Sequence, residues 1–467
     1  MNRGGALGKR LDALRINNES LMHGAHRSLE KGDIKAIALS YVDNSGLSRV
    51  KAIPFAKLES ALAKGVGMSP VFDAFLFDDT ITASAYSGGP IGDIRLFPDL
   101  ESMALVAGAP GWAWAPAIRF SQDGEEYSLC HRSYAARTMA ALAEVGIVAK
   151  MSFEIEWIVS DGQGDEFIPG CDGPAYGLER IVELGDYLLD ILRALEIAGI
   201  EVEQVHPEYA PGQFEISVAP LDPVRAADAS VLVKHIIRSS SSRFGLRASF
   251  APSVVAGGVG NGGHLHCSFW RDGLNLFSGG SKRNGLTDAG ESILAGVLKE
   301  LPALCAIGAP SVASYLRLVP QHWAGVFRCW GVENREAALR LVEATTLVAA
   351  ESANAELKPF DLSSSPYLTV GAVAAVAKHY FDKSLSLPEP VGVDPASLSP
   401  DELVKLGIER LPKSVGEALD CLYASKVITE SLGEELLTAF AAVRVAEVGQ
   451  LDGKSPEEVV AATRWKY

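Results

Sequence analysis

The stretch KMSFEIEWIV, residues 150–159, sets two glutamates into a run of large apolar residues. Side chains on a β-strand alternate between its two faces, so the Phe, Ile and Trp of this stretch share one face. Glu154 and Glu156 then share the other face. Two neighbouring carboxylates repel each other, and burying them without a partner is costly. The pattern therefore predicts a strand whose polar face lies against positive charge.

Two further segments place polar residues within apolar, strand-like sequence. In EQVHPEYAPGQFEIS, a turn at Ala-Pro-Gly separates Glu208 from Glu215, so a hairpin would bring both carboxylates together. In GNGGHLHCSF, His264 and His266 are two positions apart and share one face. Each motif alone also fits an exposed edge strand, a structural histidine or a bare turn. Together they favour an oxygen-rich site for Mg²⁺ or Mn²⁺ rather than zinc or copper.

Composition narrows the class of protein. The 467 residues suffice for two or three domains, and 48% apolar with 21% charged residues is an ordinary globular balance. The net charge of −16 disfavours nucleic acid and anionic membranes as partners and suits small, cationic ligands. The chain shows no signal-like leader and no apolar run of membrane-spanning length, and its six cysteines are scattered. We therefore expect a cytoplasmic protein with reduced thiols.

The chain divides into a small α+β region and a longer region of helices between polar strands. AIALSYVD and LSRVKAI predict a hairpin around Asn44-Ser45-Gly46, and residues 55–65 predict a helix that ends at Gly65. GAPGWAWAPA, residues 108–117, is the strongest boundary signal. Later helices are expected at 134–146, 177–198 and 225–245, and the C-terminal tail is expected to be helical with a structural role.

An arginine-rich segment follows the histidine motif. Four arginines lie within 24 residues: Arg317, Arg328, Arg335 and Arg340. In so acidic a protein they would form an anion-binding surface for phosphate or carboxylate, or else a solvated, salt-bridged face. Further on, Glu356 and Lys358 precede a Ser-Pro turn and a helix of small residues, where in isolation they would count as surface residues.

Taken in order, these segments resemble five motifs of the glutamine synthetase family over nearly the whole chain. FEIEW resembles the GxExEF strand, HPEYAPGQFEIS the E-x-x-x-G-Q-x-E hairpin, and GNGGHLHCS the NGxHxHxS segment. RLVP…NREAALR resembles the arginine-bearing segment, and AELKPFDLSSSPYL resembles EVRxPDPxANPYL. Ser152 replaces a glycine of the first motif, and Lys358 replaces an arginine of the last.

The resemblance implies an α+β fold with two domains. Residues 1–30 would be an N-terminal extension that is partly helical or mobile, and residues 31–128 a small β-grasp domain. Residues 129–467 would form a large glutamine-synthetase-type catalytic domain with a curved antiparallel sheet flanked by helices. It also implies assembly into hexameric rings, stacked as a dodecamer, with each active site between neighbouring subunits.

The resemblance further implies roles for individual residues. Two to three Mg²⁺ or Mn²⁺ ions would be bound per active site, one by Glu154, His264 and Glu356 and a second by Glu156, Glu208 and Glu215. The residues along ATP would be Glu203, His206, His266, Ser268, Arg335 and Arg340. Those around glutamate would be Asn261, Gly262, Arg317 and Lys358. The implied reaction converts the glutamate γ-carboxylate to γ-glutamyl phosphate, which an amine then attacks, with Arg317, Arg335 and Arg340 neutralising charge.

The sequence departs from the ammonia-using members of the family at the acceptor. Trp323 stands six residues beyond Arg317, where those members carry a glutamate on a flap over the ammonium. GVGMSPVFDAFLFDD holds no clean match to the loop that supplies an ammonium-binding aspartate, and the tail lacks an adenylylation-type tyrosine. These departures, with VDNSGL, GWAWAP and CWGVENREAALR, resemble the γ-glutamylpolyamine synthetase branch.

The resulting hypothesis is an ATP-dependent glutamate–amine ligase whose acceptor is a polyamine such as putrescine, cadaverine, spermidine or spermine. Trp323 would then lie against the acceptor. One alternative is a ligase for another primary amine or for ammonia. An alternative of another class is a catalytically silent structural relative. Six intact polar ligands in a core count against the silent relative, because burying them is costly.

Overall fold

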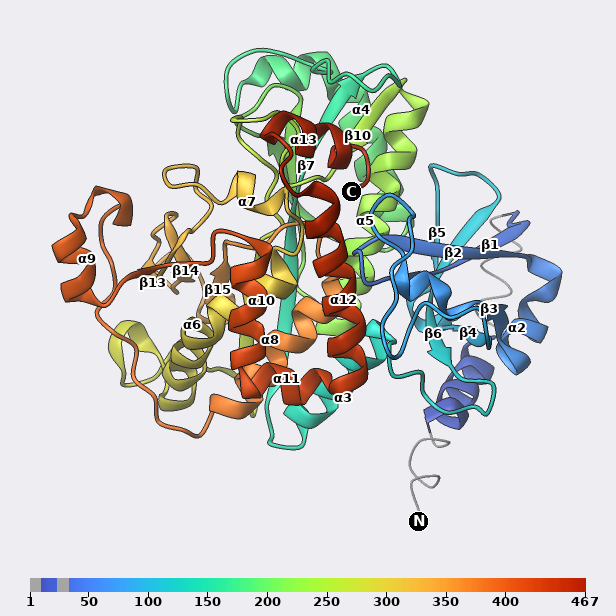
Figure 1. Ribbon diagram of the computed structural model, residues 1–467, viewed down its shortest axis with the longest axis horizontal. Coiled ribbons are helices and arrows are strands. Elements are labelled where there is room, and N and C mark those ends of the chain that lie inside the picture. Colours follow the sequence, from blue (N-terminus) through green and yellow to red (C-terminus); the bar gives the residue numbers. More distant parts are fainter. Residues whose placement is uncertain (1–9, 23–32) are drawn as a thin grey trace.

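The computed structural model describes residues 10–22 and 33–467, which form two sheets set side by side (Figure 1). Residues 10–22 are helical, and Leu11 and Leu14 pack against Phe97 and Phe120 of the small sheet. The rest of the predicted N-terminal extension lies outside the described residues.

The small domain is built on a six-stranded sheet in the order β2-β1-β6-β4-β3, with β5 also paired to β6. Its strands are β1 (Ala36–Val42), β2 (Ser48–Pro54), β3 (Val66–Met68), β4 (Ile94–Pro98), β5 (Ala104–Leu105) and β6 (Trp112–Phe120). The predicted hairpin is present as the antiparallel pair β1–β2, while β1 and β6 run parallel. Helix α2 (Leu58–Lys64) follows β2 and ends at Gly65, as the sequence predicts.

The prediction that residues 108–117 mark a domain boundary is wrong. Most of that segment belongs to β6, which pairs with β1, β4 and β5 and so lies inside the small sheet. The alternation of Trp and Ala is a strand pattern, and it places Ala113 and Ala115 in the small core. Gly108, Pro110 and Gly111 belong to the turn that leads into the strand, whereas Pro116 lies within it.

The catalytic domain holds a ten-stranded sheet in the order β16-β13-β14-β15-β11-β7-β9-β8, with β10 on β7 and β12 on β11. Its strands are β7 (Val148–Asp161), β8 (Val202–Pro207), β9 (Gln213–Val218), β10 (Leu246–Ser249), β11 (Leu265–Arg271), β12 (Leu274–Asn275), β13 (Phe327–Val332), β14 (Ala337–Val342), β15 (Asn354–Leu357) and β16 (Glu409–Arg410). The pairing is antiparallel apart from β13–β14, which are parallel. This sheet and its flanking helices confirm the predicted fold class.

Strand β7 carries Glu154 and Glu156 within an otherwise largely apolar stretch. Phe153, Ile155 and Trp157 are buried in the main core, so the apolar face of β7 points inward as predicted. Strand β7 pairs with β9 on one side and β11 on the other, which sets the polar residues of three strands next to one another.

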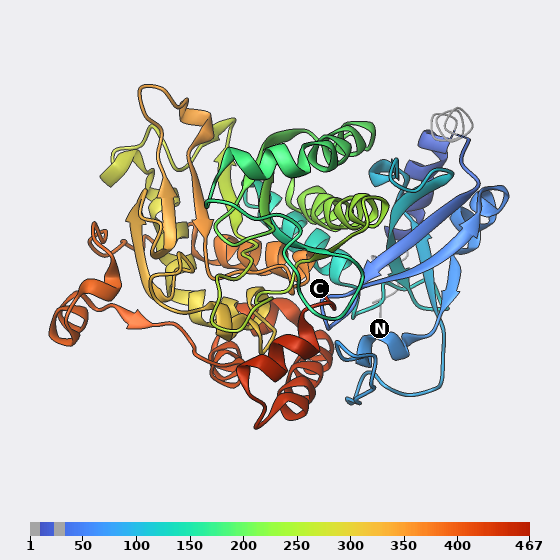
Figure 2. The same cartoon turned by 90° about the horizontal axis from the view of Figure 1, so that it is seen from above.

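Eleven helices accompany this sheet in the described part of the large domain. They are α3 (His131–Ala143), α4 (Leu178–Ile197), α5 (Pro223–Arg243), α6 (Asp288–Gly308), α7 (Ser314–Arg317), α8 (Pro366–Tyr380), α9 (Pro400–Leu406), α10 (Val415–Ala424), α11 (Lys426–Leu432), α12 (Glu434–Leu451) and α13 (Pro456–Thr463). Helix α5 begins after Asp222, whose side chain accepts hydrogen bonds from the backbone N–H groups of Val224 and Arg225. In the view from above, α4 and α5 lie between the small domain and the far strands of the catalytic sheet (Figure 2).

A buried ion pair joins the C-terminal helices to the small domain. On α12, Arg444 Nη2 lies 3.0 Å from Glu447 Oε2, and both residues are almost fully buried. Arg444 also donates to the Asn44 carbonyl at 2.8 Å, and Glu447 accepts from Ser45 Oγ and the Phe77 N–H, each at 3.0 Å. The helical tail thus fixes the β1–β2 turn against the catalytic domain.

All six cysteines are free. Among the described residues, none of the helices combines the length and apolar character that a membrane crossing requires. The cytoplasmic location expected from the cysteines stays a prediction.

Candidate active site

A cavity of about 970 Å³ opens over the polar face of the catalytic sheet. Most of the residues predicted for the site line it: Glu154, Glu156, Glu203, His206, Glu208, Glu215, His264, His266, Ser268, Arg317, Trp323, Arg335, Arg340 and Lys358. The other three predicted residues, Glu356, Asn261 and Gly262, do not line the cavity but lie next to residues that do or that contact its lining. Glu356 contacts His264, Asn261 accepts a hydrogen bond from Gln213, and the Cα of Gly262 faces Glu156.

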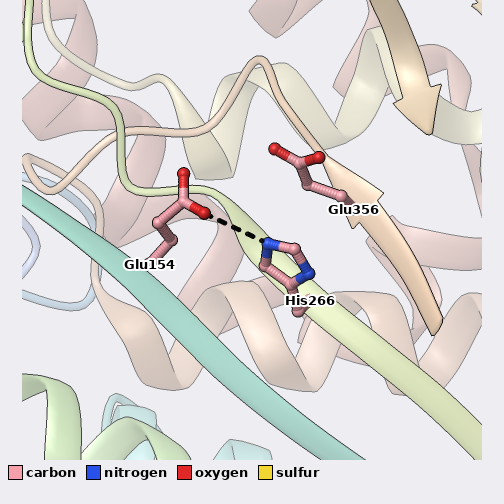
Figure 3. Close-up of side chains that lie close together, drawn as sticks. All are labelled: Glu154, His266 and Glu356. Atoms are coloured by element: carbon pink, nitrogen blue, oxygen red, sulfur yellow. Dashed lines mark ion pairs between the residues drawn. The ribbon is translucent and has the colours of Figure 1, made fainter. Parts of the chain in front are cut away.

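One cluster of donors forms where β7, β11 and β15 lie side by side. His264 Nδ1 lies 2.8 Å from Glu154 Oε1 and 3.0 Å from Glu356 Oε1. His266 Nε2 lies 3.5 Å from Glu154 Oε2, and Figure 3 shows Glu154, His266 and Glu356 converging from three strands. The cluster follows from register, because His266 is paired with Ser152 on one side and with Glu356 on the other.

A second cluster forms at the β8–β9 hairpin. His206 Nε2 lies 3.1 Å from Glu215 Oε1, and Nδ1 lies 3.7 Å from Glu208 Oε1. The hairpin needs Gly212 in its turn, because φ is +73° and a Cβ there would lie 2.6 Å from the Val159 carbonyl. The predicted hairpin therefore does bring the two carboxylates together.

Glu156 lies between the two clusters. Its Oε1 is 3.9 Å from His264 Nε2, and its Oε2 accepts a 3.0 Å hydrogen bond from Gln213 Nε2. The donor atoms that lie within 4.8 Å of one another form three groups: Glu154, His266 and Glu356; Glu154, Glu156 and His264; His206, Glu208 and Glu215. The structure thus adds His266 and His206, predicted along ATP, to the carboxylate groups. The division into two metal sets stays a prediction.

Positive charge lies over the polar face of β7, as the two glutamates require. Arg317 is buried, with Nη2 2.9 Å from His264 Nε2, and it donates to the backbone carbonyls of Lys358 and Pro359. Lys358 Nζ donates to Glu356 Oε1 at 2.8 Å, and Arg340 Nη1 donates to Glu356 Oε2 at 3.1 Å. Buried opposite charges at these distances stabilise one another strongly.

Arg335 also lines the cavity, so three of the four predicted arginines face it. Arg328 does not belong to this group. Its Nη2 forms a 2.7 Å ion pair with Glu409 on the neighbouring strand β16. The salt-bridged alternative therefore holds for Arg328. Arg317, Arg335 and Arg340 line the cavity, and Arg340 also forms ion pairs with Glu333 and Glu356.

The two clusters differ in charge balance. Burial alone would raise the pKa of Glu356, but Lys358 and His264 hold that pKa well below its usual range. Burial raises the pKa of Glu215 to about 8 despite its hydrogen bond with His206, and neighbouring carboxylates add to the rise. The hairpin cluster therefore carries more negative charge than its surroundings neutralise. Such crowded carboxylate and imidazole donors fit a hard divalent cation.

Three further residues of the site were not predicted from the sequence: Tyr176 lines the cavity, and Gln213 and Tyr209 contact residues that line it. Tyr176 donates to Glu208 Oε2 at 2.9 Å from an irregular loop where its φ is +57°, and no motif marks it. Gln213 belongs to the hairpin motif but was given no role; its amide reaches Glu156, Asn261 and the Gly260 carbonyl. Tyr209 makes an edge-to-face contact with Trp323, with ring centroids 5.6 Å apart.

Comparison with known proteins assigns the class that this fold and cavity define. The profile of the glutamine synthetase catalytic domain matches residues 128–460, and that of the glutamine synthetase N-terminal domain matches residues 22–124. The chain belongs to the glutamine synthetase family. It is thus a ligase of the glutamate–amine type, and members of this family use ATP and divalent metal ions.

Particular relatives narrow the comparison further. The chain is 50% identical over 437 residues to the γ-glutamylpolyamine synthetase GlnA3 of Streptomyces coelicolor, covering 93% of this chain and 94% of that one. A glutamine synthetase of Methanocaldococcus jannaschii is 28% identical, covering 90% and 92% of the two chains. The crystal structure of a novel glutamine synthase homolog superposes with a TM-score of 0.83 at 31% identity, covering 93% and 99%. A GmaS/ADP complex superposes at 0.80 with 26% identity, covering 92% and 96%.

Proposed function

We propose that this protein joins the γ-carboxylate of glutamate to a polyamine in an ATP-dependent, ADP-forming reaction. The observation that carries the proposal is that the cavity has a floor of charged side chains over the sheet and a rim formed by the aromatic side chains of Trp323 and Tyr209. The floor offers carboxylate, imidazole and arginine groups of the kind that phosphoryl transfer to a carboxylate requires. The rim offers aromatic faces to an alkylamine. The sequence relative named for polyamines supports the same acceptor.

The metal set is part of the proposal. Glu154, Glu156, Glu208, Glu215, His264 and Glu356 would hold two to three Mg²⁺ or Mn²⁺ ions, with His206 and His266 within reach. Bound there, the ions would supply Lewis-acid neutralisation of phosphate oxygens. Burial first, and neighbouring carboxylates in addition, raise the pKa of Glu215. A divalent cation would relieve the repulsion among these carboxylates, which supports the assignment.

The cations of the chain would orient glutamate and the transferring phosphate. Arg317 and Lys358 lie beside the first cluster and would bind the carboxylates of glutamate, next to Asn261 and Gly262. Arg335 and Arg340 would neutralise the charge that builds on the phosphoryl oxygens. Glu203 and Ser268 line the same cavity and would contact ATP together with His206 and His266.

The rim supports an extended, charged acceptor. The side chains of Trp323 and Tyr209 are 42% and 47% exposed, so both have open ring surface beside the cavity. A cation over such a ring gains about 0.5–2 kcal/mol, depending on desolvation. Tryptophan offers no base to an ammonium ion, whereas it can cover the alkyl chain and attract the distal ammonium of a polyamine.

The net charge of −16 supports the same acceptor, because an acidic protein attracts polycations over a distance. We also place the protein in the cytoplasm, where its six free thiols would stay reduced.

An omission experiment tests the proposed reaction. ADP release is measured with ATP and Mg²⁺ while glutamate, the amine, or both are left out. We expect release only when glutamate and an amine are both present, and faster release with putrescine, cadaverine, spermidine or spermine than with ammonium. A protein that releases no ADP with any amine would be the catalytically silent alternative. Release that does not require glutamate would overturn the proposal.

A further inference from the structure

A second hollow, of about 220 Å³, lies between the two domains and away from the active site. Its walls come from the β1–β2 hairpin of the small domain, from helix α5, and from the segment between β15 and α8. Figure 1 shows α5 next to strands β1 and β2, which agrees with these walls. Among the described residues that line it there is no aspartate and no glutamate.

Two cations on α5 face this hollow. Lys234 and Arg238 are one helical turn apart, so they project from the same side of the helix. Lys234 Nζ donates to the Leu362 carbonyl at 2.7 Å. Within residues 10–22 and 33–467, neither cation forms an ion pair, and the Arg238 guanidinium makes no hydrogen bond. Both pack over the ring of Phe250 instead, at 5.4 Å and 5.1 Å from its centroid.

Leaving these two charges unpaired is costly. Burial, together with the neighbouring Arg238, lowers the pKa of Lys234 to about 7, and burial lowers the pKa of Arg238 to about 10. The carboxylate that acts on Lys234 is that of Asp361, whose Oδ1 accepts hydrogen bonds from the N–H and hydroxyl of Ser363. Within residues 10–22 and 33–467, its Oδ2 has no hydrogen-bond partner and forms no ion pair with Lys234. Acidic residues outnumber basic ones by 58 to 42, so a shortage of carboxylates does not explain the missing partner.

Hydroxyl groups complete the hollow. Ser40, Ser48, Ser230 and Ser364 line it, and Ser40 Oγ accepts a 2.7 Å hydrogen bond from Trp114 Nε1. Ser40 thereby keeps its own O–H available to donate to a ligand. A guanidinium, an ammonium and hydroxyl donors around one small space are the groups that bind phosphate and carboxylate.

We propose that the hollow between the β1–β2 hairpin and α5 is a binding site for a compact anion that carries phosphate or carboxylate groups. The anion would lie between Lys234 and Arg238 and receive the Ser40 hydroxyl. Its occupancy would tie the small domain to the catalytic domain. The connection to the active site is short in sequence, because Phe153 of the wall precedes Glu154, and Leu362 follows the strand that carries Glu356.

Thermal unfolding of the full-length protein tests this site. Sulfate stands for the phosphate group and succinate for carboxylates, each compared with chloride at constant ionic strength. The double variant Lys234→Met/Arg238→Met removes both charges, and Lys405→Met on the exposed side of α9 serves as the control. We expect at least one of the two anions to raise the Tm of the wild type and of the control by about 2 °C more than it raises the Tm of the double variant. The anion that acts identifies the group that the site takes.

The active-site arginines are intact in every variant, so anion binding there contributes equally to all three proteins. An equal rise of the Tm in wild type, control and double variant would overturn the proposal, as would the absence of any rise in wild type. If the double variant does not fold, wild-type crystals soaked in selenate give the answer. An anomalous peak between Lys234 Nζ and the Arg238 guanidinium is expected. Peaks confined to the active site, or a carboxylate of a neighbouring copy within 4 Å of these cations, would rule the site out.

Discussion

At the scale of single residues, Trp323 is the position at which we propose that the choice of acceptor amine is decided. Its ring lies at the cavity rim against Tyr209, and its backbone N–H donates to Glu336 Oε1 at 2.9 Å with a φ of +52°. A left-handed backbone conformation is unusual for so large a residue, which indicates that the surrounding loop holds the indole in place.

Replacing Trp323 by glutamate should narrow the preference for polyamines over ammonium. The carboxylate removes the aromatic face and offers a base to ammonium, so the ratio of putrescine to ammonium turnover should fall by about tenfold. Trp323→Phe, which keeps an aromatic face, should retain most of the preference. The measurement is ADP release at equal amine concentrations. Equal ratios in all three proteins would mean that Trp323 only packs the loop.

Glu208→Gln should remove a proposed metal ligand with little change in shape. We expect turnover to fall by more than about 100-fold, because even outer-shell partners of a metal contribute 10- to 100-fold. The rise in Tm on adding Mg²⁺ or Mn²⁺ should shrink as well, since ligand binding stabilises the native state by mass action. The control is Glu166→Gln, an exposed glutamate in a loop. A Glu208→Gln protein with normal activity and an unchanged metal effect contradicts the assignment.

At the scale of elements, strand alternation was enough to predict β7, β9, β11 and the polar face that they share. The grouping of donors was not predictable, because it depends on register and on the distance across the hairpin. His206 and Glu215 are directly paired across β8 and β9, and no sequence spacing encodes that pairing. Tyr176 lies in an irregular loop without a periodic pattern, so nothing marked it as a site residue.

The segment between β10 and β11 passes close to two side chains of the active site at Gly262, where only a glycine fits. A Cβ on Gly262 would lie 2.5 Å from both Glu156 Oε1 and His264 Nε2. Gly262→Ala should therefore displace these two groups and lower turnover by more than about tenfold, while the fold is retained. Gly392→Ala is the matched control, because no atom lies within 4 Å of its added Cβ. Turnover and far-ultraviolet circular dichroism are measured together, and a fully active Gly262→Ala protein would refute the close approach.

The half-buried Lys234 of helix α5 should affect the pH dependence of the free energy of unfolding. The pKa of Lys234 is about 7 in the folded protein, lowered by burial and by Arg238 and opposed by Asp361, against about 10.4 when unfolded. Between these values the unfolded chain binds more protons, so this group makes the free energy of unfolding rise with pH from about 7 to 10. Below pH 7 both states are protonated and the full cost of burying the charge remains.

The measurement is denaturant unfolding from pH 6 to 9 in anion-poor buffer. Lys234→Met should be the more stable protein at pH 6, and the difference should diminish as the pH rises. The wild type and Lys405→Met should share one profile. A difference between wild type and Lys234→Met that is constant with pH would show that Lys234 does not titrate in this range.

At the scale of the whole molecule, the two domains were predictable from motifs, but their connection was not. The ion pair of Arg444 and Glu447 joins the tail to Asn44, Ser45 and Phe77, residues 370 to 402 positions away. The sequence of the tail predicts only helices with a structural role. No local sequence pattern identifies residues so far along the chain as the partners of these helices. The same limit applies to the hollow at α5, whose walls come from both domains.

Assembly is the prediction that belongs to this scale. The family resemblance implies rings in which the small domain of one subunit completes the active site of the next. We therefore expect the 49.6 kDa chain to form a dodecamer in light scattering, and a fragment of residues 129–467 to be inactive. Wild-type protein that stays fully active as a monomer would contradict this arrangement.

The proposed function depends on which amine accepts the γ-glutamyl group, and a competition experiment between two amines tests this most directly. The enzyme is given ATP, Mg²⁺ and glutamate with equal concentrations of putrescine and ammonium, and both products are quantified by mass spectrometry. We predict γ-glutamylputrescine as the main product, in about tenfold or greater excess over glutamine. An excess of glutamine would contradict the account.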